Sequence, residues 1–560
     1  MKKNFVRLRW FFTMLLFVTT MIMPSMMLAE ESITPTRPKG DGKTEPYQIS
    51  NAAELYWFAG LVNGTLTGVK KNISANAKLM NDITVNEGVL DAINKDQVSG
   101  KNFIPWTPIG TSRDDAYTGT FDGKGYTISG LYFNNSTSYY VGLFGCIGAN
   151  GKISNVGVLD SYFQFCALGG GVCGMNKNGE LQNCSNSSTV ICYKQDGTGG
   201  VCGKNYGTDR DCKNTGSVRG IEPLGGVCGV NESGIIENCF NEGTVSVTVI
   251  ISAGGGGVCG ANFDGGTITN CYYLSNTAPR GIGGWADVSG KAEKMSIEHV
   301  ESGEVAWLLN GKGLGEQVWG QQLGIDQSPV LGSAYKVIKA AQGDKDANGN
   351  YTYWATFSNL TNDVTLSVPS DRSLKVYNAT VSGGKLTMTE RDKQVAKKEG
   401  VLLKTNGEYV NAKANETDGL PKASSDLVAT PTVAQIVTAN GYILYRLTYN
   451  DATNKEGLGF YLGVDKANNS YDGTRLKATP GKAYLKVSEN EAKAPSSAAL
   501  TRSFVFGGGS ETTGIDEITI MGTDVQRHGT IEGIFDLQGR KIVNPTKGIY
   551  IKNNKKVIIK

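Results

Sequence analysis

The sequence predicts an all-β protein: a right-handed parallel β-helix (solenoid) with helical caps, then antiparallel β-sandwich material and a small C-terminal β tail. Three observations carry this prediction. Glycine occupies 74 of 560 positions while charged residues make up only 19%, which suits a turn-dense β-protein. The motif "GGVCG" recurs at intervals of roughly one solenoid coil. From Tyr335 onward, short apolar-alternating segments separated by turns replace the repeat.

The first 29 residues have the pattern of a secretory signal peptide. Basic residues precede an apolar run from Trp10 to Met23, and small-residue cleavage is expected after Ala29. We therefore expect a secreted or cell-surface protein, with residues 30–46 as a linker. No later apolar run approaches the roughly 20 residues that span a bilayer, so the mature chain is expected to have no transmembrane segment.

The repeat aligns in two columns, and the distances inside each unit vary less than the distances between units. The members of the first column are spaced by 29, 29, 26 and 31 residues, and each member of the second column follows its partner by 10 to 12 residues. This pattern indicates a solenoid whose strands keep register while one loop absorbs changes in length. The first column contains Phe144, Cys173, Cys202, Cys228 and Cys259, and the second contains Val156, Cys184, Cys212, Cys239 and Cys271.

Three short strands are predicted for each coil, for example at 171–174, 180–184 and 189–192, joined by polar turns. Glycine pairs are expected at the corners, where they can adopt positive φ. Stacked coils about 4.8 Å apart would place both columns as ladders facing the interior of a β-helix over residues 47–333.

The columns bear on the chemistry of the 11 cysteines. Because Phe144 and Val156 share these columns and offer no redox or metal chemistry, the cysteines are interpreted as small apolar packing residues. Disulfides between neighbouring coils remain an alternative, and the odd number would then leave at least one thiol unpaired. Structural zinc is the least favoured reading, because no Cys-x-x-Cys knuckle is present. No metal and no cofactor are predicted.

Helices are expected at both ends of the repeat. In "SNAAELYWFAGLVNG", Asn51 is placed to cap a helix with Glu54 at its third position, and this helix could cover the first coil. In "SGEVAWLLNGKG", a second helix is expected from Ser302 to Gly311, where it could close the last coil.

The stretch "FIPWTPIGTSRDDAYTGTFDGKGYTISGLYF" (103–133) and the following "VGLFG" and "GGVCG" units resemble the GLUG-motif region of bacterial surface proteins, including IgA-peptidase-like proteins and adhesins. The segment 302–331 is similar to the usual end of such regions. The resemblance covers residues 47–333, and cysteine replaces the commoner large apolar residue of the motif. It implies a scaffold or binding surface, since in that family the repeats accompany catalytic domains without being the catalyst.

The region 334–506 is predicted to form an antiparallel β-sandwich of one or two units, with a long loop at 411–428. Residues 507–530 have linker composition. The tail 531–560 alternates apolar and polar residues around short turns. It resembles the end of a type IX secretion sorting domain through Pro545, Gly548 and Tyr550, which implies the export machinery as a partner. A plain terminal β-element is the alternative.

Hydrolase signatures are missing from the sequence. Neither His299 nor His528 belongs to a recognised catalytic or metal-binding motif. The motifs His-Glu-x-x-His and Gly-x-Ser-x-Gly do not occur. Asp114, Asp115 and Asp122 could supply paired carboxylates, but turn sequence explains them better. The segment from Asp344 to Ala355 resembles the start of an EF-hand but lacks its Glu at position twelve, so a hairpin is preferred. Trp106, Tyr272 and Tyr273 could stack on sugars, although aromatic residues in a solenoid are more often packed.

The sequence therefore predicts a non-catalytic surface protein that acts as an adhesin or binding scaffold for host or glycan ligands. Two alternatives remain: a carbohydrate-active β-helix enzyme, and a structural spacer of the cell envelope. The net charge of +3, from 55 basic and 52 acidic residues, gives no reason to expect nucleic acid as a partner.

Overall fold

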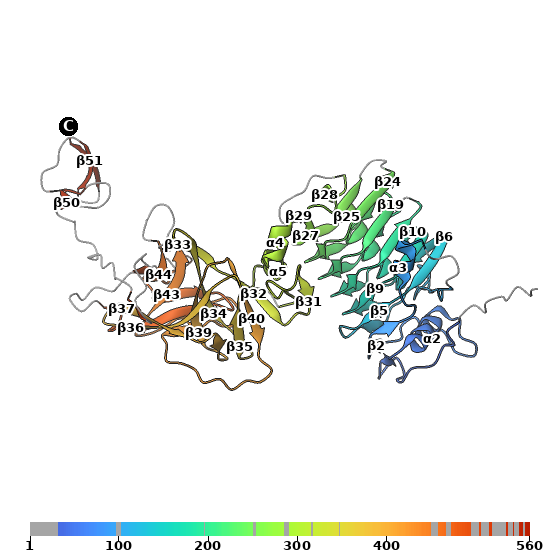
Figure 1. Ribbon diagram of the computed structural model, residues 1–560, viewed down its shortest axis with the longest axis horizontal. Coiled ribbons are helices and arrows are strands. Elements are labelled where there is room, and N and C mark those ends of the chain that lie inside the picture. Colours follow the sequence, from blue (N-terminus) through green and yellow to red (C-terminus); the bar gives the residue numbers. More distant parts are fainter. Residues whose placement is uncertain are drawn as a thin grey trace, which may run out of the picture. The chain divides into compact units, whose positions relative to one another are not determined.

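The computed structural model describes residues 32–493 except for short gaps, and beyond them a series of strands. The gaps are 97–101, 195, 250–253, 285–290, 315–316, 347, 450–456, 466 and 468–471, and the later strands are 503–505, 515–517, 534–535, 541–542, 548–552 and 555–559. The predicted signal peptide and its cleavage point lie outside the described residues. The chain divides into two compact units, Met1–Ile338 and Lys339–Lys560, and each is described by itself (Figure 1).

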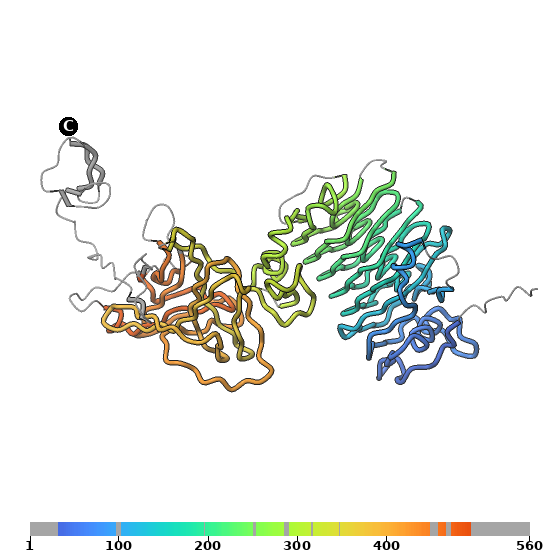
Figure 2. Tube along the Cα trace, in the orientation of Figure 1, coloured from blue at the N-terminus to red at the C-terminus, as the bar shows by residue number. Residues whose placement is uncertain are grey.

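The first unit is a parallel β-solenoid in which every coil adds a strand to the same sheets (Figures 1 and 2). This confirms the predicted fold class. Sheet A has eight parallel strands, and its order follows the chain: β1 (Tyr47–Ile49), β2 (Ala77–Leu79), β4 (Thr120–Asp122), β8 (Lys152–Ser154), β12 (Glu180–Gln182), β17 (Thr208–Arg210), β22 (Ile235–Glu237) and β26 (Thr267–Thr269).

Sheet B also has eight strands, and they stack in the same chain order. They are β3 (Ile83–Thr84), β5 (Thr127–Ser129), β9 (Gly157–Leu159), β13 (Ser185–Asn186), β18 (Lys213–Asn214), β23 (Phe240–Asn241), β27 (Cys271–Leu274) and β29 (Ala292–Met295). In both sheets the chain direction is preserved from coil to coil, as a solenoid requires.

Sheet C has 13 strands and forms the remaining side of the coils. One group consists of β6 (Tyr132–Val141), β10 (Tyr162–Gly169), β14 (Thr189–Cys192), β19 (Ser217–Ile221) and β24 (Val245–Val249). The other consists of β7 (Phe144–Ile147), β11 (Cys173–Asn176), β15 (Thr198–Gly199), β16 (Cys202–Asn205), β20 (Leu224–Gly225), β21 (Cys228–Glu232), β25 (Gly255–Phe263) and β28 (Arg280–Ile282).

A coil contains more strand segments than the three that the sequence predicts. The predicted strand 180–184 ends early, at Gln182 of β12, because the chain turns a corner at Asn183 with φ 54°, and β13 begins only at Ser185. Equivalent corners occur at Asn155, Asn238 and Asn270, with φ between 50° and 54°. Asparagine tolerates the left-handed region better than most residues, so one residue type makes this corner in successive coils.

The glycine pairs of "GGVCG" serve a different purpose from the one predicted. They do not adopt positive φ; instead, other backbone and side-chain atoms approach them too closely for a Cβ. A Cβ on Gly225 would lie 1.8 Å from the carbonyl oxygen of Cys228, and one on Gly171 would lie 1.9 Å from Oδ1 of Asn186. The first glycine of the motif therefore permits a tight backbone bend, and the second leaves room for a buried asparagine.

Two ladders of buried asparagine side chains run along the solenoid. In the first, the amide of each residue donates to Oδ1 of the residue one coil later, at 3.0, 2.9 and 2.8 Å along Asn176, Asn205, Asn231 and Asn262. In the second, Asn186 donates to Asn214 at 2.9 Å and Asn214 to Asn241 at 2.8 Å. Because buried amides are costly without partners, these ladders help to fix the stacking register.

One corner carries Asp211 in place of asparagine, with φ 52°. Burial raises the pKa of Asp211 to about 6 from an ordinary value of 3.8, against the lowering effect of the Asn238 amide. The folded state therefore holds a proton between about pH 4 and pH 6 that the unfolded state releases. It follows that this residue lowers the stability of the solenoid as the pH rises through that window.

We expect Asp211→Asn to be more stable than the natural chain at pH 8 by about 1–2 kcal/mol, since an amide needs no ionisation at this corner. The difference should shrink as the pH falls from 7 to 4. Urea unfolding of both proteins across this range measures it. A difference that does not change with pH would show that ionisation of Asp211 has no part in it.

The N-terminal end of the solenoid is covered by helix α2 (Ala52–Asn63), as the sequence predicts. Asn51 Oδ1 accepts the backbone N–H of Glu54 at 3.0 Å, and the helix ends at Gly64 with φ 73°. The ring of Phe58 lies 6.0 Å from that of Phe121, so the helix joins the interior core. A short helix, α3 (Val89–Asn94), follows, and Asp160 accepts the N–H groups of Val89 and Leu90 in its first turn.

Near the other end, two short helices pack on sheet B. These are α4 (Ile297–Glu301) and α5 (Glu304–Leu309). The N-cap of α5 is Gly303, one residue after the predicted Ser302, which ends α4 instead. The helices bury apolar side chains against Phe240 and Tyr272. Since Cys271 belongs to the interior core and Tyr272 follows it in the same strand, the helices cover the outer face of sheet B. The pair β30 (Trp319–Gly320) and β31 (Val330–Leu331) follows, and then β32 (Tyr335–Lys339).

The second unit is antiparallel, as predicted. Its largest sheet runs in the order β33 (Ala341–Lys345), β34 (Tyr351–Ser358), β39 (Gly400–Thr405), β36 (Leu374–Ser382), β37 (Lys385–Arg391) and β48 (Ile515–Glu517). A five-stranded sheet contains β41 (Leu427–Ala429), β46 (Ala483–Ser488), β43 (Tyr442–Tyr449), β44 (Leu458–Leu462) and β47 (Ser503–Val505). One hydrophobic core, which includes Trp354, Leu402, Tyr445 and Phe460, lies between these two sheets.

Smaller sheets complete the second unit. Strands β40 (Tyr409–Ala414), β35 (Val364–Ser367) and β38 (Gln394–Val395) pair in this order, and β42 (Gln435–Thr438) pairs with β45 (Arg475–Ala478). The predicted loop at 411–428 begins and ends in strands, and β48 lies inside the predicted linker. In the tail, β50 (Lys541–Ile542), β49 (Ile534–Phe535), β51 (Gly548–Lys552) and β52 (Lys555–Ile559) form one sheet.

Candidate functional site

The structure brings the predicted first column into register as a row of side chains in sheet C. Cys173 has Phe144 and Cys202 as its Cα partners in the neighbouring coils, and Cys228 has Cys202 and Cys259. All these side chains are fully buried. The thiols of Cys202 and Cys228 donate weakly to the carbonyl oxygens of Lys204 and Val230, at 3.4 and 3.2 Å.

The second column lies at the corner where sheet B begins. Its five residues are at most 1% exposed and belong to the interior core. The thiol of Cys212 donates to the carbonyl oxygen of Arg210 at 3.2 Å, and the other thiols of this column have the same type of contact. Burial raises the pKa of Cys212 and Cys239 well above the usual thiol range, which is the opposite of what a reactive cysteine needs.

One interior row of sheet A contains a residue that the sequence analysis does not single out. Asp209 occupies the position that Leu181 holds one coil earlier and Ile236 one coil later. It is 0% exposed and faces Cys202 and Cys228. The aligned segments "ELQ", "TDR" and "IIE" already contain this signal, because a carboxylate stands there in an otherwise apolar column.

The three carboxylates considered for glycan hydrolysis are not gathered into one site: Asp114 and Asp115 lie in a turn, Asp114 being exposed, and Asp122 is the last residue of β4. Asp115 pairs with Lys71, and Asp122 pairs with Lys124 at 2.8 Å. Burial opposes ionisation of Asp122, but hydrogen bonds from Asn155 and Lys124 outweigh it, so its pKa lies below the ordinary value. A general acid in glycoside hydrolysis needs a raised pKa, so Asp122 is poorly suited to that role.

The other residues considered from sequence have structural surroundings. Trp106 and Tyr272 are 2% and 4% exposed, and Tyr273 is fully buried, so none presents an open platform to a sugar. His299 lies on α4, where Nδ1 is 2.9 Å from the Ser296 hydroxyl. The EF-hand-like segment forms the preferred hairpin between β33 and β34, in which Asp346 accepts two backbone N–H groups of its own turn. His528 and Pro545 lie outside the described residues, while Gly548 and Tyr550 belong to β51.

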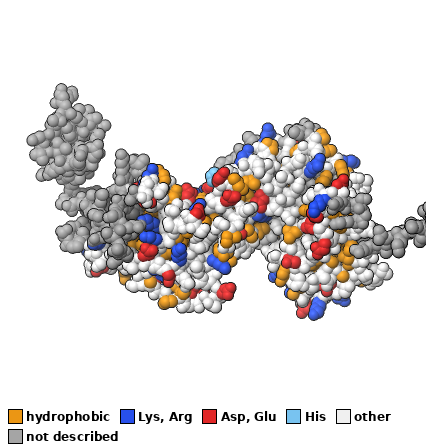
Figure 3. Space-filling model, viewed as in Figure 1, with side chains coloured by type: hydrophobic (Ala, Val, Ile, Leu, Met, Phe, Trp, Pro, Cys, Tyr) orange, Lys and Arg blue, Asp and Glu red, His pale blue; other side chains and the backbone are white. Residues whose placement is uncertain are grey.

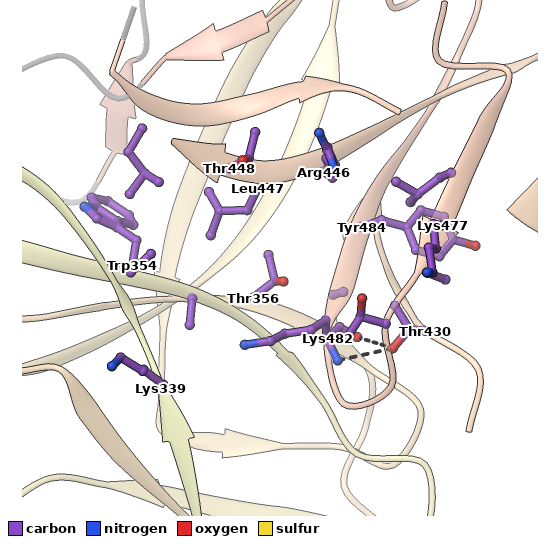
Figure 4. A pocket seen from close by; sticks show the side chains of 17 residues that line it. Lys339, Trp354, Thr356, Thr430, Arg446, Leu447, Thr448, Lys477, Lys482 and Tyr484 are labelled. Atoms are coloured by element: carbon purple, nitrogen blue, oxygen red, sulfur yellow. Dashed lines mark hydrogen bonds between the residues drawn. The ribbon is translucent and has the colours of Figure 1, made fainter. Parts of the chain in front are cut away.

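The second unit contains a cavity of about 280 Å³ that the sequence analysis does not predict. Its walls come from the end of β32 and from β33, β34, β43, β44, β45 and β46, together with Thr430 and the turn before β46. Figure 4 shows the side chains that line it. Four of these are cationic: Lys339, Arg446, Lys477 and Lys482. No Asp or Glu occurs among the described lining residues. Lys339 also forms an ion pair outside this lining, since its Nζ lies 3.7 Å from Oε2 of Glu408. The lining itself still carries an excess of positive charge, as an anion-binding site does.

Hydroxyl and aromatic groups complete the cavity. Thr356 lies among Lys339, Lys482 and Arg446 in Figure 4, with Trp354 on one side and Tyr484 on the other. Trp354 is 5% exposed, and Lys404 lies over its ring at 5.2 Å. Lys482 is held by its backbone, because its N–H donates to the Thr430 hydroxyl at 3.2 Å and its carbonyl oxygen accepts from that hydroxyl at 2.9 Å. The cations are therefore presented by strands and by a fixed turn, which favours a preformed site.

No signal in the sequence marks this cavity in advance. Its cations come from segments that are far apart in the chain, and each is one of many basic residues in strands with alternating pattern. The charged residues described in the cavity lining are all cations, whereas charged side chains of both signs are scattered over the solenoid on the face drawn in Figure 3.

Comparison with known proteins gives matches over part of the chain. No family model matches. The chain is 30% identical to Halomucin of Haloquadratum walsbyi over 168 residues, which are 30% of this chain and 2% of Halomucin. It is 36% identical over 83 residues to a protein of Evansella cellulosilytica named as a Gly-rich membrane protein, covering 14% of this chain and 9% of that protein. The chain thus spans less than a tenth of the length of these curated relatives. Among the residues that the structure describes, no helix combines the length and apolar character needed to cross a membrane.

Two solved structures are similar in part. A Bacteroides ovatus protein named as an immunoglobulin A1 protease is 18% identical, with a TM-score of 0.36 over 53% of this chain and 95% of that one. A second structure, named IgA1 protease, is 15% identical, with a TM-score of 0.27 over 45% of this chain and 17% of that one.

These names correct one prediction. The sequence predicts a protein that is not an enzyme, whereas both solved structures carry the name of an enzyme. The non-catalytic assignment is contradicted by this finding and is withdrawn. The protease name belongs to those proteins, and no activity is transferred from it to this chain.

Proposed function

We propose that this chain is an exported surface protein of the adhesin or binding-scaffold type, and that the cationic cavity of its second unit binds an acidic glycan. The observation that carries the proposal is the set of four cationic side chains around one cavity whose described lining holds no carboxylate. A carboxylate or sulfate group of a sugar would complement this charge.

The size and chemistry of the cavity support a sugar ligand. A volume of about 280 Å³ is close to the lower limit for small-molecule sites and suits one or two sugar residues. Lysine and arginine would pair with the acidic group, and the threonine hydroxyls would form hydrogen bonds with the rest of the sugar ring. Because Arg446 and Lys477 are exposed at the rim, the ligand could extend beyond the cavity along a longer polymer.

The location at the cell surface rests on sequence features. The predicted signal peptide, the GLUG-like repeat and the sorting-like tail with Pro545, Gly548 and Tyr550 all suit an exported protein. In this proposal the solenoid is a rigid scaffold that presents the second unit, and the type IX export machinery reads the tail.

The double variant Arg446→Glu, Lys477→Glu tests the binding site. We expect at least a tenfold loss of affinity for an acidic oligosaccharide, because two attractive charges become repulsive. Binding of heparin-derived and sialylated oligosaccharides, with lactose as a neutral probe, can be measured by isothermal titration calorimetry. The affinity of the natural chain should fall as salt is raised from 50 to 300 mM.

Lys422→Glu is the matched control, since Lys422 is exposed in the same unit and lies outside the cavity. This variant should bind like the natural chain. If no acidic glycan binds, or if the double variant binds as tightly as the control, the binding proposal fails. That result would favour the alternative of a structural spacer of the cell envelope. Protease treatment of intact cells would check surface location, and full protection of the chain would contradict it.

A further inference from the structure

The interior of the solenoid contains one carboxyl group, that of Asp209, within a row of apolar side chains. From β2 onward, the row of sheet A that faces the core has an apolar side chain in all coils except one. Asp209 is that exception. Its other members are Ala77, Phe121, Ile153, Leu181, Ile236 and Ile268. A carboxylate placed between leucine and isoleucine must gain a partner to offset its desolvation.

Only one of the two carboxyl oxygens of Asp209 has a hydrogen-bond partner. Oδ1 accepts the side-chain amide of Asn176 at 3.0 Å. Oδ2 is buried and has no hydrogen-bond partner. Burial raises the pKa of this carboxyl well above its usual range. Binding to a cation would satisfy the second oxygen without a proton.

Two sulfur atoms stand beside this carboxylate. One oxygen of Asp209 and the Sγ atoms of Cys202 and Cys228 all lie within 4.8 Å of one another. The ligands of a tetrahedral ion with Zn–S bonds of about 2.3 Å lie about 3.8 Å apart, so shifts of about 1 Å would bring the three atoms into coordination. Cys173, which is in register with Cys202, provides another thiol one coil away.

We propose that the solenoid interior holds a structural, thiophilic divalent ion of the zinc type, bound by Cys202, Asp209 and Cys228. Thiolate and carboxylate ligands are typical of zinc sites. Binding replaces the thiol protons of Cys202 and Cys228 and the carboxyl proton of Asp209 by the ion, and these three protons leave to solvent. The site would cross-link two successive coils through the cysteines. Sequence analysis predicts no metal here, because these residues belong to two coils and lack knuckle spacing.

Because the three ligands are buried, the ion has to enter as the chain folds. Metal affinity would then contribute directly to folding stability. This coupling permits a test by refolding. The chain from Glu30 to Lys560 is unfolded in guanidinium with a reductant, and it is then refolded with one equivalent of Zn²⁺ or with a chelator. After gel filtration, the metal content per chain is measured by mass spectrometry, and refolding with Cd²⁺ adds the ultraviolet band of cadmium–thiolate bonds.

We expect about one Zn²⁺ per chain and a cadmium–thiolate band in the natural protein. Asp209→Leu should retain at least tenfold less zinc yet remain folded by circular dichroism, because leucine is the residue of the preceding coil at this position. Asp211→Asn is the matched control: it removes a carboxylate two residues away and should keep the ion. Cys228→Ala, which removes one sulfur ligand, should weaken the cadmium band.

Three outcomes would overturn the proposal. The natural chain could refold without retaining Zn²⁺ or Cd²⁺, in which case Asp209 is simply a protonated buried acid. Asp209→Leu could retain as much metal as the control, which would place the ion on other thiols. A count of fewer than 11 free thiols, with Cys202 and Cys228 joined in a disulfide, would also exclude the site. None of these results depends on glycan binding by the second unit.

Discussion

Replacing Gly226 by alanine is expected to destabilise the solenoid by about 3–5 kcal/mol, although only one methyl group is added. The new Cβ would lie 2.2 Å from the carbonyl oxygen of Gly257 and 2.2 Å from Cγ of Asn241. The first is a backbone atom of the next coil, and the second belongs to a buried hydrogen-bonded ladder. Neither can move away without breaking the register of two coils.

Urea unfolding of the natural chain and Gly226→Ala, followed by circular dichroism, measures this effect. Gly265→Asn is the control, because Gly265 has φ 79° and open space around the position of its Cβ. Asparagine tolerates that conformation, so the control should change stability by less than about 1 kcal/mol. If Gly226→Ala unfolds like the control, the close approach of coils at the "GGVCG" motif is not what requires glycine.

The second large effect is expected at the centre of an asparagine ladder. Asn214→Ala should cost about 3–4 kcal/mol, because it leaves the Asn186 amide without its acceptor and removes one of the two donors to Asn241 Oδ1, the other being the Gly243 N–H. The same side chain also accepts from the backbone N–H of Gly216 at 3.2 Å and donates to its carbonyl oxygen at 3.1 Å. All of these groups are buried, so water cannot replace the lost partner.

The matched control is Asn81→Ala, since Asn81 is exposed and its amide makes a single long hydrogen bond of 3.4 Å to the Ser50 carbonyl oxygen. It should change the free energy of unfolding by at most about 0.5 kcal/mol. Hydrogen exchange of the Gly216 amide would localise the effect of Asn214→Ala. Unchanged protection and unchanged stability would mean that the ladder contributes nothing to the stacking of coils.

Local sequence signals predict much of the fold because a solenoid repeats its local environment. The spacing of "GGVCG" places Cys202 and Cys228 in neighbouring coils, and the structure gives them as Cα partners. The capping signal at Asn51 and Glu54 predicts α2. The role of the glycine pairs is missed, because positive φ is a property of one residue, whereas the approach of Gly257 and Asn241 to Gly226 involves other coils.

The sequence by itself determined that the chain has a stacked, turn-rich β-repeat followed by antiparallel strands, because periodicity and residue type act over a few neighbouring positions. Only the tertiary structure decided which side chains meet across coils and across sheets. It places Asp209 against Cys202 and Cys228, and it gathers Lys339, Arg446, Lys477 and Lys482 around one cavity. The physical reason is that charge, hydrogen bonding and metal coordination depend on distances of a few ångströms, and for these residues those distances are set by the packing of strands that lie far apart in the chain.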